Sequence, residues 1–184
     1  MRKISRRKLI KLGYVSITLL LAAVIVRAFP EKDPGSALST GDSLRVVEVF
    51  DGDTISVDRN GVVEKVRFIG IDTPETKDPR KPVQCFGKEA SNYTHQLLEG
   101  KRVRLEIDTT QGERDRYDRI LAYVRREAGL FVNQQLVAEG YAHEYTYQGH
   151  PYTYQADFRA AEQAAREQQK GLWSPNSCNG DTSS

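Results

Sequence analysis

Acidic side chains stand at both ends of one strand-like run, DGDTISVDRNGVVEKVRFIGIDTPE. Asp51 and Asp53 open the run, Asp72 and Glu75 close it, and Arg67 lies on the stretch between them. Carboxylate oxygens gathered at strand ends suit a hard divalent cation such as Ca²⁺, and the planar fork of an arginine suits the oxygens of a phosphate. A metal ion, an arginine and a spare acid together predict a site that cleaves phosphodiester bonds.

Each of these residues also has a purely structural interpretation. Asp51-Gly52 and Asn60-Gly61 are dipeptides typical of hairpin turns. Arg67 alternates with apolar neighbours, as expected for the solvent-facing side of a strand. Taken singly, such short motifs favour the structural interpretation. Their concentration in one segment favours the catalytic one.

The types and spacing of these residues resemble the staphylococcal nuclease (thermonuclease) family. The resemblance extends from about Val47 to Ser174 and so covers nearly the whole domain. The matching residues are Asp51-Gly52-Asp53-Thr54, Arg67, Ile71-Asp72-Thr73-Pro74-Glu75-Thr76, Asp115-Arg116-Tyr117-Asp118-Arg119 and Leu121-Ala122-Tyr123. The resemblance identifies the chain as an exported member of this family.

The resemblance implies a metal site at the two strand ends. Asp53, Asp72 and the carbonyl of Thr73 would hold Ca²⁺, and Asp51 would support these ligands without binding the ion. Two carboxylates and one carbonyl leave coordination positions for water and for a phosphate oxygen, as a catalytic site requires. Glu75 resembles the family's general base, or the residue that orients the attacking water.

The resemblance also implies how the substrate is held. Arg67 and Arg119 would clamp the phosphoryl oxygens and stabilise the charge that develops there. Tyr117 resembles a tyrosine that hydrogen-bonds the terminal phosphate of a nucleotide. Tyr145 and Tyr147 fall where the family places a pair for base stacking and phosphate contact. For these last two, packing in the core or at its rim remains an open alternative.

One position departs from the family pattern, because Asp118 stands where a glycine usually precedes the second arginine. Aspartate tolerates a left-handed backbone better than most residues, so the turn can survive. Its charge is expected to compete with phosphate for Arg119. We therefore expect Asp118→Gly to raise kcat/KM on DNA modestly.

The activity implied by the resemblance is that of a Ca²⁺-dependent endonuclease indifferent to the sugar. It would break the phosphate–5′-oxygen bond of DNA and RNA and leave 3′-phosphates. Single-stranded or frayed substrates and a monomeric enzyme are expected. Two other classes remain: a non-catalytic nucleic-acid-binding domain of the same fold, and an OB-type module that binds oligosaccharide or protein.

Hydrophobic periodicity predicts five short strands and three helices. Strands are expected over 44–50, 54–57, 62–71, 103–107 and 120–124, and helices over 86–99, 130–140 and 154–168. This pattern fits an α+β fold, mainly β, in which a five-stranded OB-type Greek-key barrel carries about three packed helices. The resemblance implies the same fold, whereas periodicity alone indicates only α+β.

The N-terminus predicts export. Residues 1–28 carry seven basic and no acidic side chains, and Ser5 to Lys11 resembles a twin-arginine motif before a short apolar stretch. We interpret 1–28 as a signal peptide or an uncleaved anchor, 29–43 as a linker, 44–178 as the nuclease-like domain and 179–184 as a flexible tail. The protein is expected in the periplasm, secreted, or anchored outside the cytoplasm, with no other contact to membrane.

Without residues 1–28 the chain keeps 20 basic and 25 acidic residues, a formal charge of −5. An acidic domain does not bind polyanions non-specifically, so its contacts with nucleic acid must be local. The candidates for a local basic patch are Lys77, Arg80, Lys81, Arg114, Arg116 and Arg119. Ordinary solvated surface charge remains the alternative for most of them.

The chain contains two cysteines, Cys85 and Cys178. In an exported protein an even pair predicts one disulfide, here joining the start of the first helix to the chain after the last. Two free thiols are the alternative.

Overall fold

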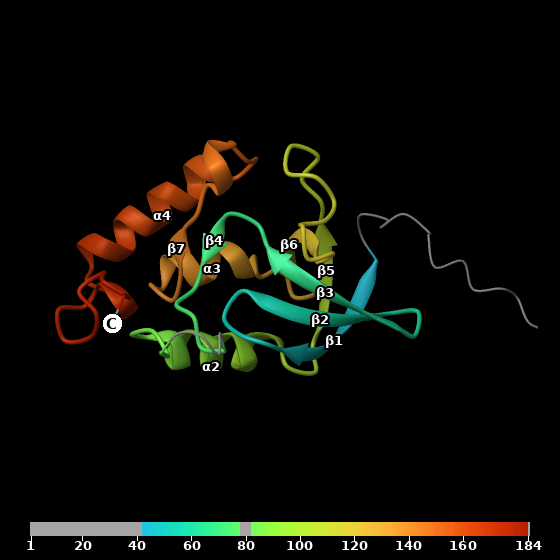
Figure 1. Cartoon of the computed structure of the whole chain (residues 1–184), viewed down its shortest axis with the longest axis horizontal. Coiled ribbons are helices and arrows are strands. Elements are labelled where there is room, and N and C mark those ends of the chain that lie inside the picture. Colours follow the sequence, from blue (N-terminus) through green and yellow to red (C-terminus); the bar gives the residue numbers. More distant parts are fainter. Residues whose placement is uncertain (1–41, 78–81, 184) are drawn as a thin grey trace, which may run out of the picture. The chain divides into compact units, whose positions relative to one another are not determined.

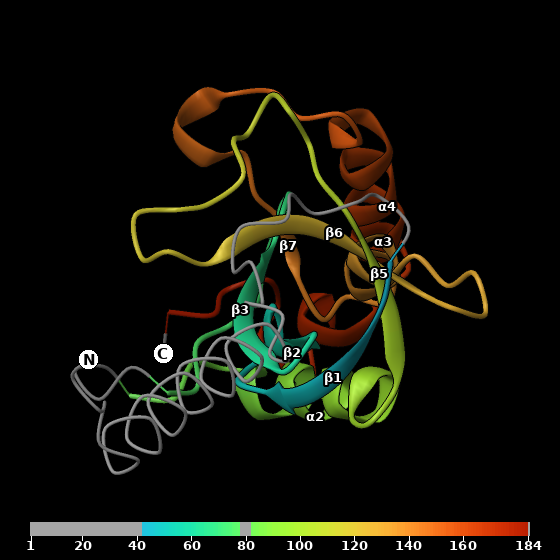
Figure 2. The same ribbon diagram turned by 90° about the vertical axis from the view of Figure 1, so that its right-hand side faces the viewer.

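The computed structural model describes residues 42–77 and 82–183. Its centre is a closed barrel of five strands, β1 (Ser43–Val49), β2 (Thr54–Arg59), β3 (Val62–Phe68), β5 (Arg102–Glu106) and β6 (Ile120–Arg126). Their order around the barrel is β1-β2-β3-β6-β5, and β5 closes on β1. Only β3 and β6 run parallel among these pairs (Figure 2). The barrel confirms the predicted OB-type architecture.

Several sequence predictions lie outside the described residues. They are the export segment at 1–28, nearly all of the linker at 29–43, and Arg80 and Lys81 of the basic patch. Within the described part of the chain, no helix is long and apolar enough to cross a membrane.

β-Branched and aliphatic side chains fill the barrel interior, as the strand patterns predict. Ile55 and Val57 of β2, Val66 of β3, and Ile120 and Val124 of β6 are fully buried. Burying one such side chain contributes about 1.5–3 kcal/mol, so the barrel is a rigid support for the residues that project from its strand ends.

Within residues 42–77 and 82–183, three α-helices pack around the barrel, close to their predicted positions. α2 (Gly87–Leu98) lies against β1, and α3 (Val132–Ala138) lies between β6 and α4 (Gln155–Glu167) (Figure 1). On the α4 side of this core, the ring of Tyr123 makes edge-to-face contacts with Phe131, Tyr154 and Phe158. These contacts fix α4 onto the barrel.

The predicted strand 62–71 was wrong in its length, because the chain turns at Gly70. Gly70 has φ +78°, and a Cβ there would lie 2.6 Å from the ring of Tyr152, so only glycine fits. After the turn, β4 (Ile71–Asp72) leaves the barrel and pairs with β7 (His143–Glu144). This short sheet carries Asp72 to the barrel edge.

A disulfide joins Cys85 to Cys178, which are 93 positions apart in the sequence. The predicted pairing is therefore confirmed. The bond connects the N-terminal end of α2 to the chain that follows the short 3₁₀ helix η2 (Gly171–Trp173).

Candidate active site

The loop between β1 and β2 places Asp53 where two strand ends meet. Its Oδ2 accepts hydrogen bonds from the backbone N–H of Thr73 at 3.0 Å and from the Thr73 hydroxyl at 3.2 Å. Its Oδ1 accepts one from Thr54 Oγ1 at 3.0 Å. A buried carboxylate with this many donors is held in one orientation. The structure thus brings together Asp53 and Thr73, which the sequence predicted as metal ligands.

Helix α2 supports this loop from behind. Thr94, fully buried on α2, donates from Oγ1 to the carbonyl of Gly52 at 2.8 Å. A Cβ at Gly52 would lie 2.6 Å from Cγ2 of Thr73, so the two strand ends approach as closely as they do only because residue 52 is glycine.

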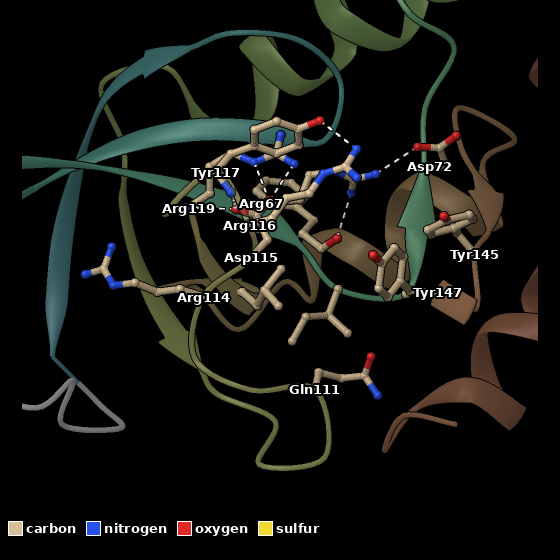
Figure 3. A pocket seen from close by; sticks show the side chains of 14 residues that line it. Arg67, Asp72, Gln111, Arg114, Asp115, Arg116, Tyr117, Arg119, Tyr145 and Tyr147 are labelled. Atoms are coloured by element: carbon tan, nitrogen blue, oxygen red, sulfur yellow. Dashed lines mark hydrogen bonds and ion pairs between the residues drawn. The ribbon is translucent and has the colours of Figure 1, made fainter. Parts of the chain in front are cut away.

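Arg67, near the end of β3, bridges the two candidate metal ligands. Its Nη2 lies 2.8 Å from Asp72 Oδ1 (Figure 3). The same Nη2 lies 3.1 Å from Asp53 Oδ2. Its Nη1 donates to the carbonyls of Phe68 and Ile71, each at 2.8 Å. The Arg67 side chain is only 14% exposed. This set of partners fixes the guanidinium at the junction of the two strand ends.

The donor set fits a calcium ion. Burial raises the pKa of Asp51 to about 7, and the charge of Asp53 acts in the same direction. The available donors are oxygens, which Ca²⁺ prefers. No group of three His, Cys, Asp or Glu side chains in the described residues could hold a metal by itself. The predicted set needs only two carboxylates, with the Thr73 carbonyl and waters completing the coordination.

Glu75 lies beside this loop, near enough that its charge also raises the pKa of Asp51. Its Oε1 accepts from the backbone N–H groups of Thr76 at 2.8 Å and Lys77 at 2.6 Å. Its own backbone is bonded twice to Gln84. The structure therefore places the predicted base next to the predicted metal ligands.

A pocket of about 460 Å³ opens on the other side of Arg67 and Asp72. Its wall contains all the predicted phosphate- and base-binding residues, namely Arg67, Arg116, Tyr117, Arg119, Tyr145 and Tyr147. Tyr145 and Tyr147 lie near Asp72, and Tyr117, Arg116 and Arg119 form a group across from them (Figure 3). Asp72 lines the pocket as well, whereas Asp51, Asp53 and Thr73, here called the metal loop, and Glu75 do not.

The tyrosines of the pocket are not core residues. Tyr117 is 64% exposed, Tyr147 50% and Tyr145 43%. Between the last two, Thr146 turns the other way: its Oγ1 donates to Glu144 and accepts from Gln155, both at 2.6 Å. Anchoring the middle residue of an extended segment leaves both neighbours on the opposite side. Packing in the core, one alternative for these two tyrosines, does not apply.

Arg119 is oriented by Asp115, a residue of the matching motif to which the sequence pattern gave no role. Asp115 Oδ2 accepts from Arg119 Nε at 2.7 Å and from its Nη2 at 2.6 Å. Asp115 Oδ1 accepts from the backbone N–H groups of Tyr117 and Arg119. Partial burial opposes ionisation, but these bonds lower the pKa of Asp115. One carboxylate thus closes the turn and holds the guanidinium.

The expectation that Asp118 competes for Arg119 was wrong. The Asp118 side chain is 88% exposed, and its Oδ1 lies 3.6 Å from Nη1 of Arg114. Arg119 has Asp115 as its carboxylate partner instead. The other part of that prediction is confirmed, because Asp118 has φ +63° and occupies the left-handed region.

Sequence reasoning missed the residues that support the site. Asp115 could have been found from the short turn that separates it from Arg119, where an aspartate side chain commonly caps backbone N–H groups. Gln84 and Thr94 gave no local signal, since their partners lie 9 and 42 positions away.

The chain resembles known nucleases over most of its length. A family model described as Staphylococcal nuclease homologue matches residues 65–175. The thermonuclease of Staphylococcus hyicus is 39% identical over 165 residues, which cover 86% of this chain and 95% of that protein. The thermonuclease of Staphylococcus intermedius is 38% identical over 169 residues, which cover 90% and 98%. Endonuclease YncB of Bacillus subtilis is 41% identical over 127 residues, 68% of this chain and 58% of that protein.

Proposed function

The chain belongs to the staphylococcal nuclease family, and from this premise we propose that it is a calcium-dependent endonuclease acting on both DNA and RNA. As a member of the family it is a nuclease, a hydrolase whose substrates are nucleic acids. The proposal adds the ion, the indifference to the sugar, and 3′-phosphate products formed by breaking the bond from phosphorus to the 5′-oxygen.

The observation that carries the proposal is the position of Arg67. Its guanidinium contacts both Asp53 and Asp72, and it also lines the pocket with the exposed tyrosines. A phosphate bound at this point would replace the carboxylates of Asp53 and Asp72 as the partner of Nη2, because Nη1 is already engaged by the carbonyls of Phe68 and Ile71. Arginine binds phosphate through two parallel hydrogen bonds, which also fixes the orientation of the phosphate.

In the proposed reaction, Glu75 accepts a proton from the attacking water. Its carboxylate lies beside the metal loop and outside the substrate pocket, so it can act on water while the pocket holds the strand. Arg67 and Arg119 donate to the phosphoryl oxygens as negative charge grows on them. Asp115 keeps two donors of Arg119 occupied, so Arg119 offers its remaining N–H groups in a fixed direction.

Asp53, Asp72 and the carbonyl of Thr73 are the residues that would hold calcium. The ion, when bound, supplies charge neutralisation and polarisation of a phosphate oxygen. Asp51 restrains the loop, because its Oδ1 accepts from the backbone N–H of Asp53 at 3.3 Å.

The open pocket suits a strand that is single or frayed. Tyr145 and Tyr147 present exposed rings, and stacking of a base on an aromatic side chain contributes about 1–3 kcal/mol without selecting a sequence. Arg116 Nη2 donates to the hydroxyl of Tyr117 at 2.7 Å, so the two side chains form one unit for contact with a neighbouring phosphate. Nothing in this unit needs a 2′-hydroxyl, which is why we propose activity on both DNA and RNA.

We propose further that the protein acts as a monomer outside the cytoplasm. The N-terminal segment and the disulfide between Cys85 and Cys178 are what support an exported enzyme.

The proposed activity is tested with the purified protein on single-stranded DNA and RNA oligonucleotides of the same sequence. Rates are measured with Ca²⁺, with Mg²⁺ alone and with a chelator, and mass spectrometry identifies the product ends. We expect both oligonucleotides to be cleaved rapidly with Ca²⁺, much more slowly with Mg²⁺ alone, and not at all with the chelator. The products should carry 3′-phosphate ends. Equal turnover with Mg²⁺ alone, or 3′-hydroxyl ends, would refute the proposal.

A further inference from the structure

Both main-chain polar groups of Glu75 are bonded to a single residue, Gln84. The Glu75 N–H donates to Gln84 Oε1 at 2.6 Å, and the Glu75 carbonyl accepts from the backbone N–H of Gln84 at 2.9 Å. One of these bonds uses a side chain, so the identity of residue 84 matters. The orientation of the peptide that carries the proposed base therefore depends on a glutamine outside the pocket and outside the metal loop.

Gln84 is itself held between α2 and the disulfide. The next residue, Cys85, is bonded to Cys178. The carbonyl of Gln84 accepts from the N–H of Gly87, the first residue of α2, at 3.0 Å. A Cβ at Gly87 would lie 3.0 Å from the carbonyl oxygen of Glu75, so the start of α2 packs directly on the base's own backbone.

The residue between the disulfide and the helix has an unfavourable backbone. Phe86 has φ +67°, a left-handed conformation that a bulky side chain rarely adopts and that persists only where its surroundings enforce it. Its ring packs against Tyr141 at 5.4 Å between centroids. The disulfide restrains the chain on the other side. Without that restraint, relaxation at Phe86 would shift Gln84 first, because only Cys85 separates them.

We propose that Gln84 is a positioning residue for Glu75, and that the Cys85–Cys178 disulfide holds Gln84 in place, so that the rate of cleavage depends on this bond. The proposal rests on the proposed role of Glu75 as the base. A base must be held within about 0.5 Å of its productive position, and a displacement of about 1 Å can cost roughly a hundredfold in rate. The Gln84 clamp acts on that position without contacting substrate.

The first test compares Gln84→Met with Gln84→Glu. Methionine keeps the length of the side chain and removes the acceptor, whereas glutamate keeps an acceptor oxygen in the same place. We expect Gln84→Met to lower kcat by about tenfold. This factor lies between the effect expected from the loss of one hydrogen bond and the effect expected from a displacement of about 1 Å. KM and the Kd for Ca²⁺ should be unchanged. Gln84→Glu should keep most of kcat. Gln168→Met, at the exposed C-terminal end of α4, is the matched control and should change nothing.

The second test asks whether Gln84 acts through Glu75. In a Glu75→Gln background, Gln84→Met should cause no further loss of kcat, because residues that act as a unit are not additive. Losses that multiply would overturn the proposal, as would normal kcat in Gln84→Met. A nearly normal kcat in Glu75→Gln alone would instead refute the proposed role of Glu75, so the two failures are distinguishable.

The third test removes the disulfide in Cys85→Ser/Cys178→Ser, at a temperature where circular dichroism shows the variant to be folded. We expect kcat to fall about tenfold, with no further loss on adding Gln84→Met. Wild-type protein reduced by a dithiol, which gives two electrons and two protons and leaves two thiols, should show the same loss, and this comparison decides the matter if the variant does not fold. Unchanged kcat in the folded protein without the disulfide would overturn the proposed role of the bond.

Discussion

The two sides of Arg67 are built differently. On the metal-loop side, Asp53 is buried and its carboxylate accepts three hydrogen bonds, while Thr94, Gly52 and Gln84 support the loop and the backbone of Glu75. On the pocket side, the side chains of Tyr117, Tyr145 and Tyr147 are about half exposed or more. The difference indicates that the groups proposed to cleave the bond beside the metal loop are preorganised, whereas the tyrosines proposed to bind the strand leave room for varied bases.

The largest effects are expected on the metal-loop side. Glu75→Gln and Arg67→Lys should each lower kcat by about 10²–10³, the usual cost of removing a group that acts in the transition state. Lysine cannot reproduce the two-pronged contact of Arg67. Steady-state kinetics on a DNA oligonucleotide, with circular dichroism as the control for folding, measures this. Near-normal rates in both variants would remove the basis for the division between the two sides.

The next largest effect is expected on the stability of the protein when Asp108, which supports the pocket from behind, is replaced. The buried carboxylate of Asp108 accepts from Tyr123 Oη at 2.7 Å, from Thr153 N–H at 2.8 Å and from both donors of Thr110, so it joins the two loops that carry the pocket tyrosines. Asp108→Asn should lower the free energy of unfolding by about 2–4 kcal/mol at pH 7, since hydrogen bonds to a charged group each contribute about 1.5–3 kcal/mol. Urea denaturation measures this.

The pH dependence of the free energy of unfolding tests whether the charge of Asp108 causes the stabilisation. Burial opposes ionisation, yet the bonds from Thr153, Tyr123 and Thr110 hold the pKa of Asp108 below its ordinary value of 3.8. The stabilisation is therefore fully present above pH 3.8 and is lost as the pH falls further. The difference between wild type and Asp108→Asn should narrow below pH 3.8. A difference that stays constant with pH would show that the charge of Asp108 contributes nothing.

A smaller effect is expected for the pocket tyrosines. Tyr147→Leu should raise KM for single-stranded DNA by roughly five- to tenfold, near the lower end of the range for base stacking, and leave kcat nearly unchanged. Steady-state kinetics on an oligonucleotide separates the two constants. A fall in kcat with constant KM would place Tyr147 on the catalytic side and break the comparison.

The smallest effect is expected at Asp118. Its exposed pairing with Arg114 contributes about 0–1 kcal/mol, and glycine is at ease at φ +63°. Asp118→Gly should therefore change kcat/KM by no more than a few-fold, upward at low salt because one negative charge is removed near a polyanion. A large loss that is independent of salt would show that Asp118 orients the turn.

Most of the site could be predicted from the sequence because its residues lie in a few short motifs. Adjacent positions such as Asp72 and Thr73 stay together in any fold, and Asn60-Gly61 set the hairpin that brings Arg67 back beside the β1–β2 loop. The break at Gly70 was not predicted, because the apolar pattern continues through it and the reason for the turn is the distant ring of Tyr152.

Partners that come together only in the folded chain were beyond local reasoning. Adjacency in the sequence made Asp118 the expected partner of Arg119, whereas the turn geometry brings Asp115 to it. In the same way, the bonds between Gln84 and Glu75 depend on where α2 starts and on the disulfide, and neither sets a pattern in the neighbouring residues.

The central claim is that the strand-end carboxylates form a calcium site, and calcium titration calorimetry tests it most directly. We expect wild-type protein to bind one Ca²⁺, Asp72→Asn to bind it at least tenfold more weakly because a charged ligand is lost, and Asp115→Asn, which removes a carboxylate from the pocket side, to bind it normally. Asp72 is partly exposed, so its substitution should leave the fold intact. Unchanged calcium affinity in Asp72→Asn would contradict the account.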